Sequence, residues 1–320
     1  MSPVVYLPRR LEPEFEDPLR AALDPSIELL SGALERRDYE VLVAGVPTPE
    51  ELDASPHLRV LVIPWAGLPA RTRELLLERP RIDVHNLHHN AAPVAETALG
   101  LLLAAAKLLV PMDRRLRAFD WTPRYESRAG SLLAGRRALV LGYGHVGRRL
   151  GAACAALGMR VTGIRRRPDP GAEDEASPGR LHELLPDCHA LLSCLPVTEA
   201  TRGWIGEAEL ALLPRGALVV NVGRAEVFDE DALYGALAGG HLGGAGLDVW
   251  YRYPEDEAAR RSTAPSARPF HELENVVLSP HRAGHCDGTA RLRAEHLARL
   301  LNAAARGEPL PDRVDLERGY

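Results

Sequence analysis

One short stretch, Ala138-Leu-Val-Leu-Gly-Tyr-Gly-His-Val-Gly147, constrains the fold of this chain more than any other. The apolar run 138–141 is typical of a buried strand, and glycines follow it at the spacing G-x-G-x-x-G. A helical pattern over 146–157 and a strand pattern over 159–164 come next. In such a unit the first glycine allows a tight turn, the second lets the backbone approach a pyrophosphate, and the third lets helix and strand pack closely. The stretch predicts a dinucleotide-binding βαβ unit whose helix N-terminus faces the phosphates; a glycine-rich turn in another βαβ unit is the alternative.

Short apolar strands alternate with helices along the whole chain, which predicts an α/β protein with a Rossmann-type doubly wound parallel sheet. Strands are expected at 4–7, 41–44, 60–63, 82–86, 138–141, 160–164, 190–194, 217–221, 244–248 and 276–279. Helices are expected at 18–34, 49–54, 71–78, 94–110, 146–157 and 292–305. The helix 94–110 is apolar on nearly every side, so we expect it to be buried between domains or subunits. The loops 169–179 and 254–269 are rich in Pro, Ala, Ser and charge and are expected to be mobile.

Composition narrows the class of protein. A length of 320 residues suggests about two domains, and 46% hydrophobic with 26% charged residues is ordinary for a globular protein. A net charge of −5 gives no reason to expect a nucleic-acid or membrane partner, and the longest apolar run, 99–110, is too short to span a bilayer. Four cysteines without a C-x-x-C pair, and a start without a signal-peptide pattern, predict reduced thiols in a cytoplasmic protein.

Three histidines, His85, His88 and His89, lie close together just before the long helix. Such a group can bind a metal ion, but no cysteine or carboxylate pattern accompanies it. We therefore interpret them as loop histidines and expect no metal site.

The order of several motifs resembles the D-isomer-specific 2-hydroxyacid dehydrogenases over roughly residues 55–300. Besides the glycine stretch, the motifs are Asn90-Ala-Ala-Pro-Val-Ala-Glu96, Cys194-Leu-Pro-Val-Thr-Glu-Ala-Thr-Arg-Gly203, Asn221-Val-Gly-Arg-Ala-Glu226, Gly246-Leu-Asp-Val-Trp250 and Ser279-Pro-His-Arg-Ala-Gly284. The resemblance implies an NAD(P)-binding Rossmann domain over 93–285. It also implies a smaller, discontinuous, flavodoxin-like substrate domain made of 1–92 and 286–320, with the active site between the domains. Members form dimers through the cofactor domain, so a homodimer is expected, with helix 94–110 as an apolar contact.

The resemblance assigns the reaction chemistry to Arg224 and His281. Hydride transfer to a 2-keto acid needs a cation that holds the carboxylate and polarises the carbonyl, and a donor that protonates the developing alkoxide. A guanidinium holds a carboxylate by two parallel bonds, and an imidazole titrates near neutral pH. A structural ion pair for Arg224 and a packed core position for His281 are the alternatives, and both fit the motifs less well.

The chain departs from the family at a third catalytic position. The family usually has a glutamate there that orients the histidine and raises its pKa, whereas this chain has Tyr253. A phenol can orient an imidazole by a hydrogen bond, but at neutral pH it does not stabilise imidazolium as a carboxylate does. Glu255 supplies the carboxylate charge of the missing glutamate if the loop after Trp250 is shifted relative to that of the family. Formate dehydrogenases of this superfamily also lack the glutamate and bind formate with an asparagine where Asn90 stands, so a formate-like substrate is left open.

Binding residues also follow from the resemblance. Trp65, Ala66 and Gly67 match the loop whose N–H groups meet the substrate carboxylate, although an interdomain packing role for Trp65 is equally compatible. Asp248 is expected either to face the nicotinamide amide or to cap the end of its strand. The other expected cofactor-binding residues are Gly142, Gly144, His145, Val146, Gly147, Arg165, Arg166, Cys194, Leu195, Pro196, Thr201, Val222, Gly223 and Gly284.

Cofactor choice depends on the residue at the end of the second strand. NAD enzymes place Asp or Glu there, about 20 residues after the glycines, to bind the ribose 2′-hydroxyl. Here that position is Arg165, followed by Arg166 and Arg167. Guanidinium attracts a 2′-phosphate, which predicts a preference for NADP(H). If these arginines are only solvated, NAD(H) binds adequately instead.

Two kinds of function fit the sequence. The first is an NAD(P)-dependent oxidoreductase that acts on a small 2-hydroxy or 2-keto acid. The second is a non-catalytic nucleotide-binding protein on the same fold, which responds to redox state by binding a partner. Retention of Arg224 and His281 favours the enzyme, whereas replacement of the glutamate by Tyr253 favours the binder.

Overall fold

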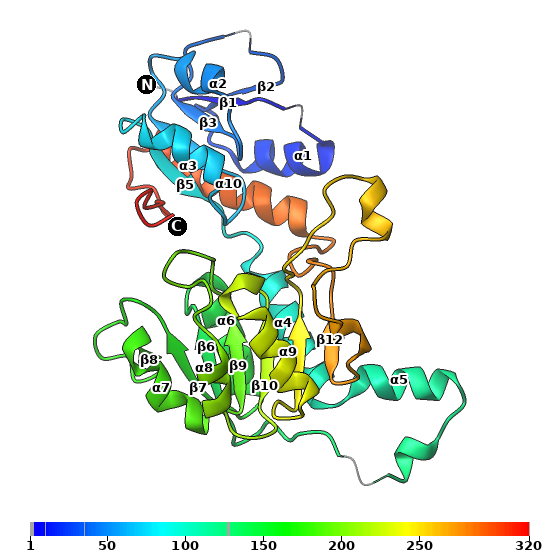
Figure 1. Ribbon diagram of the computed structural model, residues 1–320. Helices are drawn as coiled ribbons and strands as arrows, with labels where there is room; N and C mark the ends of the chain where they lie inside the picture. Colours follow the sequence, from blue (N-terminus) through cyan, green and yellow to red (C-terminus); the bar gives the residue numbers. More distant parts are fainter. Residues whose placement is uncertain (1–2, 10, 35, 127–128, 320) are drawn as a thin grey trace. The chain divides into compact units, whose positions relative to one another are not determined.

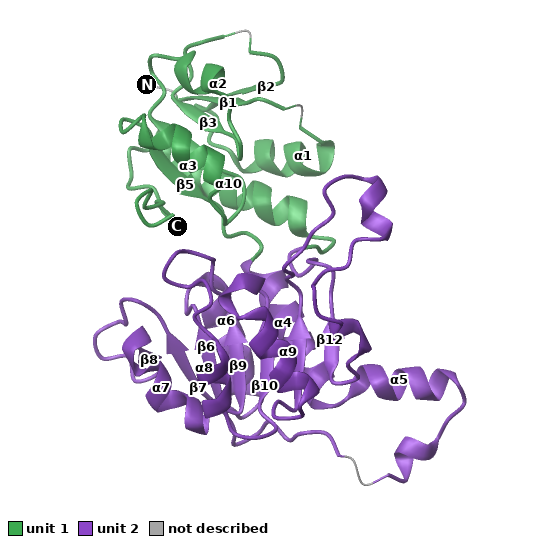
Figure 2. Cartoon of the chain, in the orientation of Figure 1, with its two compact units in different colours: residues 1–90, 285–320 green, residues 91–284 purple. Residues whose placement is uncertain are grey.

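The computed structural model describes residues 3–9, 11–34, 36–126 and 129–319, and the chain divides into two compact units (Figure 2). Unit 1 contains residues 1–90 and 285–320, and unit 2 contains residues 91–284. The chain therefore leaves unit 1, forms the whole of unit 2 and then returns. The boundaries expected from the sequence lie one or two residues away.

The described part of unit 1 contains a five-stranded parallel sheet in the order β2-β1-β3-β4-β5, which is the flavodoxin-like order (Figure 1). Its strands are β1 Val4–Leu7, β2 Glu28–Ser31, β3 Val41–Val43, β4 Val60–Ile63 and β5 Asp83–Asn86. Its helices are α1 Pro13–Ala22, α2 Pro49–Asp53, α3 Ala70–Leu77 and α10 Thr289–Ala305. Helix α10 comes from the returning segment and packs against α1, so the two segments of unit 1 share one core around Leu19 and Leu297.

The predicted helix 18–34 is wrong beyond Ala22, where α1 ends. The carboxylate of Asp24 accepts hydrogen bonds from the N–H and the hydroxyl of Ser26, which forms a turn, and the edge strand β2 follows. This strand pairs in parallel with β1. The apolar spacing continues across the turn, so two short elements together imitate the periodicity of one helix.

The described part of unit 2 contains a seven-stranded parallel sheet in the order β12-β11-β10-β9-β6-β7-β8. Its strands are β6 Arg137–Leu141, β7 Arg160–Ile164, β8 Glu175–Ala176, β9 Ala190–Ser193, β10 Leu218–Asn221, β11 Gly244–Leu247 and β12 Val276–Leu278. Its α-helices are α4 Ala91–Ala106, α5 Leu109–Arg117, α6 His145–Ala156, α7 Leu181–Leu184, α8 Glu207–Leu212 and α9 Glu230–Ala238. The strand order reverses between β6 and β9, and doubly wound sheets bind ligands at such a switch point.

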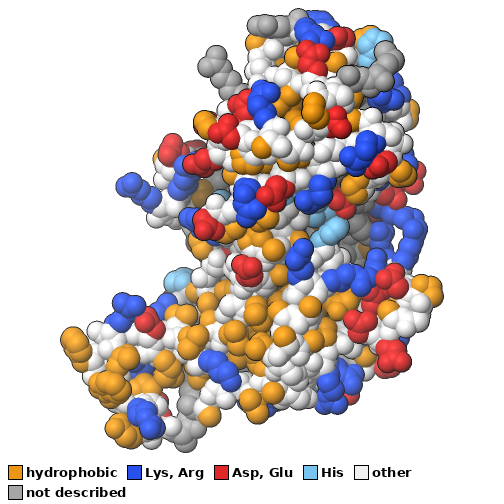
Figure 3. All heavy atoms as spheres, turned by 180° about the vertical axis from the view of Figure 1, so that it is seen from behind, with side chains coloured by type: hydrophobic (Ala, Val, Ile, Leu, Met, Phe, Trp, Pro, Cys, Tyr) orange, Lys and Arg blue, Asp and Glu red, His pale blue; other side chains and the backbone are white. Residues whose placement is uncertain are grey.

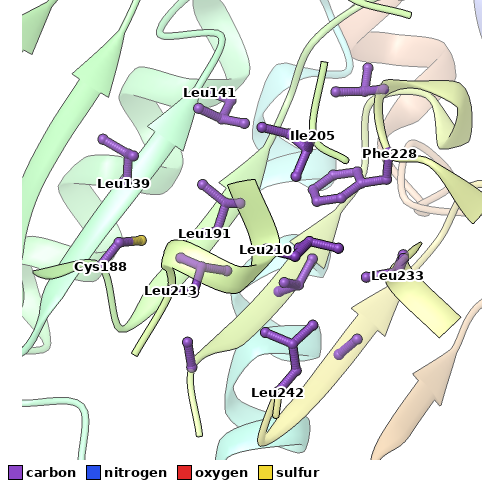
Figure 4. Packing of buried hydrophobic residues seen from close by; sticks show 14 of the residues in the cluster. Leu139, Leu141, Cys188, Leu191, Ile205, Leu210, Leu213, Phe228, Leu233 and Leu242 are labelled. Atoms are coloured by element: carbon purple, nitrogen blue, oxygen red, sulfur yellow. The ribbon is translucent and has the colours of Figure 1, made fainter. Parts of the chain in front are cut away.

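Alternate residues of each central strand enter cores on opposite faces of this sheet. Leu139 and Leu141 of β6 pack with α7, α8 and α9 in the core that Figure 4 shows from close by. Ala138 and Val140 pack with α4 and α6 on the other face. Because both faces are covered, a central strand is a continuous apolar run, and such runs were recognisable in the sequence. The two-residue strand β8 was not predicted; it lies inside the loop expected at 169–179.

The predicted helix 94–110 is two helices. Helix α4 ends at Ala106, Leu108 has a left-handed φ of 56°, and α5 follows at an angle of 66°. Helix α4 packs on α6, β10 and β11, so much of its apolar surface is buried within unit 2; its expected contact with another subunit stays a prediction. Among the described helices, none is by itself long and apolar enough to cross a membrane; the bent pair α4 and α5 meets that criterion by length and composition only.

Candidate active site

The turn between β6 and α6 has the geometry that a bound nucleotide requires. Gly142 has a φ of +86°, which residues with a side chain rarely adopt. A Cβ at Gly147 would lie 2.2 Å from the carbonyl oxygen of Gly142, so only glycine lets α6 start this close to the strand. A Cβ at Gly144, the N-cap of α6, would meet nothing within 4 Å. The first turn of α6, which includes His145 and Val146, therefore starts beside open space that fits a phosphate group.

Loops from the carboxyl ends of β9 and β10 approach this turn. A Cβ at Gly223 would lie 2.3 Å from the carbonyl oxygen of Leu195, and a Cβ at Gly142 would lie 3.2 Å from the carbonyl of Cys194. Val222 is buried in the same core as α6. Three of the motifs expected to bind the cofactor thus meet at one edge of the sheet.

The loop after β9 is held by its own polar groups. The hydroxyl of Thr201 donates to the carbonyl of Pro196 at 2.8 Å and accepts the N–H of Thr198 at 2.8 Å. Loss of solvation raises the pKa of the Cys194 thiol to about 12, so this thiol is protonated at neutral pH. Thr201 therefore shapes the loop, a role that the motif alone does not distinguish from direct contact with a nucleotide.

Asp248, just after β11, holds the loop that carries His281. Its carboxylate accepts the backbone N–H of Arg282 at 2.9 Å and of Ala283 at 3.0 Å, and it also accepts the hydroxyl of Ser279. Asp248 is only 1% exposed. These bonds match the capping role among the two roles that the sequence leaves open.

The backbone of His281 has a left-handed φ of 56°, which is uncommon for a residue with a side chain. Such a conformation persists where the surroundings impose it. Asp248 fixes the backbone after His281 through its bonds to the N–H groups of Arg282 and Ala283. Trp250 fixes the backbone before it, since its indole N–H donates to the carbonyl of Ser279 at 2.8 Å. The imidazole itself is exposed. The role of Trp250 was not predicted from the sequence, although its position two residues after Asp248 in a motif was the available signal.

Arg224 lies near the end of the neighbouring strand β10. The side chain of Asn221 donates to the Arg224 carbonyl at 2.9 Å and accepts the N–H of Gly223 at 3.1 Å, which fixes the backbone on which the guanidinium sits. The guanidinium donates to the carbonyl of Gly223 at 2.7 Å. Across the described residues, no carboxylate forms an ion pair with Arg224, which is exposed. The structural ion pair considered from the sequence is therefore absent there.

Tyr253 lies against His281, with ring centroids 5.5 Å apart and planes tilted by 52°. Its hydroxyl accepts the backbone N–H of Trp250 at 3.1 Å. Burial raises the pKa of Tyr253 above its usual value, although the Trp250 N–H and the charge of Arg224 act in the opposite direction. The phenol is therefore uncharged at neutral pH. Glu255 lines a hollow of about 420 Å³ together with Tyr253, so a carboxylate is present on the same loop.

Replacing Tyr253 with glutamate is expected to move the basic limb of the pH profile for reduction upward by about one to three units, because a nearby carboxylate raises the pKa of an imidazole. The proton donor is then charged at higher pH, so reduction continues where the wild-type rate has already fallen. Tyr253→Phe keeps the ring contact but loses the acceptor for Trp250, so we expect a lower rate and an unmoved limb. Profiles of kcat/KM from pH 5 to 10 check both variants. An unmoved limb in Tyr253→Glu contradicts this account.

Arg165 directly follows β7, at the position that governs cofactor choice. Its guanidinium lies 3.4 Å from Asp169 and 3.6 Å from Glu175, a residue of β8 whose side chain is fully buried. Arg148 of α6 lies closer to the same two carboxylates, at 2.8 and 2.5 Å. The charge of Arg165 is thus partly balanced within the chain. The sequence did not reveal this balance because β8 was not recognised.

The expected substrate loop, Trp65 to Gly67, follows β4 in unit 1. The carbonyl of Ala66 accepts a hydrogen bond from the side chain of Asn86 at 2.7 Å, which fixes the loop to the end of β5. Trp65 is 41% exposed, and its indole fills the space above Gly45, where a Cβ would lie 1.8 Å from the ring. Trp65 therefore packs within its own unit and still presents part of its indole. Asn90, a partly buried residue, ends this segment of unit 1.

His85 has a structural role. It is buried on β5, and its Nδ1 lies 2.6 Å from the carbonyl of Pro311. Burial is the main cause that lowers the pKa of His85 below its usual value. Its contact fixes the carboxyl-terminal segment to the sheet of unit 1.

Fold and strand-end loops together define the class: a two-unit α/β protein with a dinucleotide-binding Rossmann sheet, as in nicotinamide-dependent dehydrogenases. The sequence profile described as D-isomer specific 2-hydroxyacid dehydrogenase, NAD binding domain, matches residues 99–283, and the chain belongs to this family. It is therefore an NAD(P)-dependent oxidoreductase of the 2-hydroxyacid dehydrogenase class.

Relatives and solved structures agree with this assignment. The chain is 30% identical to a glyoxylate reductase from Korarchaeum cryptofilum, over 99% of this chain and 97% of that protein. It is 31% identical to a D-3-phosphoglycerate dehydrogenase from Mycobacterium leprae, over 91% of this chain and 53% of that longer protein. Among solved structures, a D-isomer specific 2-hydroxyacid dehydrogenase from Xanthobacter autotrophicus Py2, in complex with NADPH and MES, has a TM-score of 0.79 at 25% identity, with both chains fully covered.

Proposed function

We propose that the protein reduces a small 2-keto acid to the 2-hydroxy acid, with Arg224 and His281 as its catalytic residues. The observation that carries this proposal is that both side chains are exposed and follow the carboxyl ends of two strands that flank β11. These strands belong to the sheet whose switch point carries the glycine turn. The strands involved are β10 and β12, and Asp248, just after the intervening β11, holds the histidine loop. A substrate carbonyl carbon bound between these two side chains and the nicotinamide would have a cation for the carboxylate, a proton donor for the oxygen and a hydride donor within reach.

Each residue then has a defined task. Arg224 binds the substrate carboxylate and polarises the carbonyl, since its guanidinium has donors left after its bond to Gly223. His281, as imidazolium, donates the proton to the oxygen that becomes the hydroxyl. The nicotinamide cofactor, when bound, supplies the hydride. Tyr253 restricts the orientation of the His281 ring by direct contact and does not stabilise it with a charge.

Steady-state turnover tests this function. We expect oxidation of NADPH with glyoxylate or hydroxypyruvate, because the chain is 30% identical over nearly its full length to a glyoxylate reductase. Formate with NADP⁺ tests the formate-like alternative that Asn90 raised. No turnover in either direction, in a preparation that binds NADPH, would instead support a non-catalytic nucleotide binder.

For the cofactor, we propose a preference for NADP(H), with NAD(H) as the weaker ligand. Arg166 and Arg167 are exposed beside Arg165, and a doubly charged 2′-phosphate gains from such a group of guanidinium side chains. A related structure, an NADPH-dependent glyoxylate/hydroxypyruvate reductase from Sinorhizobium meliloti, was solved with NADP and has the same fold at a TM-score of 0.76.

Arg165→Asp is expected to weaken NADPH binding by about 10- to 100-fold while changing NADH binding little, since charged hydrogen bonds are worth about 1.5–3 kcal/mol. Glu175→Gln should strengthen NADPH binding, because it removes a negative charge that lies 3.6 Å from Arg165. Arg215→Asp is the matched control, an exposed arginine before β10 at the opposite edge of the sheet. Dissociation constants from fluorescence titration check all three variants. NADH binding tighter than NADPH binding in the wild type contradicts the preference.

A homodimer through unit 2 is also proposed. Exposed apolar side chains gather on α5 and the segment after it, namely Leu109, Leu116, Phe119, Trp121 and Tyr125. Figure 3 shows hydrophobic side chains over the face of unit 2 that is seen from behind. An apolar group of this size on a soluble domain is typical of an interaction surface. The proposed dimer surface is therefore α5 and the segment after it, and not the whole helix predicted at 94–110. The α4 part of that predicted helix is largely covered within unit 2.

Light scattering is expected to give twice the mass of the chain at micromolar concentration. Phe119→Glu should shift the protein toward monomer, because the side chain is 89% exposed in the isolated chain and a charge there opposes an apolar contact. Leu212→Glu, at a 39% exposed apolar position on α8, is the matched control and should leave the mass unchanged. A monomer mass for the wild type contradicts the dimer.

A further inference from the structure

Arg293 of α10 is a partly buried cation, and within the described part of the chain it has no anionic partner. Its Nε is buried and has no hydrogen-bond acceptor. Throughout the described residues, no carboxylate forms an ion pair with it; its contact is with the ring of Phe15 on α1, 4.6 Å from the guanidinium carbon to the ring centroid. Burial lowers the pKa of Arg293 below its usual value, the direction that burial without a neighbouring carboxylate produces.

One carboxylate on each of the two helices, close in sequence to Phe15 or Arg293, pairs with an arginine of its own helix. Glu16 of α1 pairs with Arg20 at 2.7 Å. Glu295 of α10 pairs with Arg291 at 2.7 Å. Neither acid therefore neutralises Arg293, although both helices carry acids within a few residues of it.

Two histidines of unit 1 border Arg293 and add no negative charge. His89, in the loop after β5, has a buried Nδ1 without a hydrogen-bond partner. Burial lowers the pKa of His89 to about 4, and Arg293 and His296 lower it further by their charge. His296, one turn beyond Arg293 on α10, lies 3.1 Å from the carboxylate of Asp312. That carboxylate is therefore shared with a histidine rather than given to the guanidinium.

A buried charge is costly unless it is paired, and an arginine kept in such a place usually has a partner. From these contacts we infer that Arg293 and His89 form a binding site for a small oxyanion, a phosphate or carboxylate group, within unit 1. Only Nε of the guanidinium is among the buried unpartnered atoms, so Nη1 and Nη2 remain open to a ligand. Their planar fork matches the two oxygens of such a group, and the ring of Phe15 holds the guanidinium plane in place. This site lies outside the proposed hydride-transfer machinery, all of whose catalytic residues belong to unit 2.

Thermal unfolding of the protein with saturating NADPH tests the site, since the bound cofactor occupies the phosphate-binding turn of unit 2. We expect inorganic phosphate, at constant ionic strength set with chloride, to raise the unfolding temperature by ~2–4 °C at about ten times its dissociation constant. Malonate, tested separately, shows whether a dicarboxylate is preferred over phosphate. Arg293→Met should abolish the rise. In chloride alone this variant should be at least as stable as the wild type, because an uncompensated buried charge has been removed.

Arg299→Met is the matched control, an exposed arginine on the same helix, and it should keep the full rise. If Arg293→Met does not fold, Arg293→Lys, which keeps the charge and loses the planar fork, should reduce the affinity for the anion at least about tenfold. Isothermal titration with phosphate supplies the dissociation constants. The inference is overturned if neither anion stabilises the wild type relative to chloride, or if the Arg293 variant that folds gains as much as the wild type.

Discussion

Replacing His281 with alanine is expected to lower kcat for keto-acid reduction by about 10²- to 10⁴-fold while leaving the dissociation constant of NADPH within about twofold, as general acid catalysis requires. The imidazole is exposed, so its loss removes little packing. The loop itself is held by Asp248 and Trp250, through bonds to the backbone and to Ser279. The backbone at 281 therefore keeps its place in the variant, and only the proton donor is lost.

The measurement compares kcat with 2-keto acid against NADPH affinity in the same preparation. His271→Ala is the control, because this histidine of unit 2 is also exposed, with 68% of its side chain accessible, and lies outside the loops of the candidate site. It should leave both quantities unchanged. Retention of most of the activity in His281→Ala would show that the resemblance to the family is one of fold alone.

The second large effect is expected at Arg224. Arg224→Gln should lower kcat/KM by about 10²- to 10³-fold, because the variant loses both the charge that holds the carboxylate and the polarisation of the developing alkoxide. Arg224→Lys should recover only part of this loss, since an ammonium group is a point charge without a planar pair of donors. NADPH affinity should change little in either variant.

Separate values of KM and kcat distinguish a role of Arg224 in substrate binding from a role in the chemical step. If Arg224 only binds substrate, KM rises while kcat is unchanged; if it also stabilises the transition state, kcat falls too. Arg215→Lys, at the other end of β10, is the matched control and should have wild-type kinetics. A wild-type kcat/KM in Arg224→Gln contradicts the role proposed for the guanidinium.

Sequence reasoning recovered the parts of the fold that depend on local pattern. Central strands such as β6 and β9 are buried almost throughout, so their apolar runs are continuous and their ends are within one residue of prediction. The turn at Gly142 was predictable because a positive φ and a close approach leave few residue types that fit. The apolar runs of β10 and β12 also allowed Arg224 and His281 to be located shortly after strand ends.

What the sequence did not reveal depends on contacts between distant segments. The ion pairs that balance Arg165 involve Glu175, on a strand of two residues that no periodicity could indicate. The break after α4 follows from the left-handed conformation of Leu108, a residue with no preference for it. The missing partner of Arg293 became apparent only when α1 and α10, from opposite ends of the chain, were seen to pack together.

We expect direct hydride transfer between the nicotinamide and C2 of a 2-keto acid, and transfer of deuterium measures this directly. Both stereoisomers of NADPH deuterated at C4 are incubated with the protein and glyoxylate, and the 2-hydroxy acid is analysed by mass spectrometry. We expect one of the two isomers to give a product with a single deuterium on C2, and His281→Ala to give little product of either mass within the same time. A protein that binds NADPH yet yields no deuterated 2-hydroxy acid, with glyoxylate, hydroxypyruvate or any other 2-keto acid tested, would contradict the central claim.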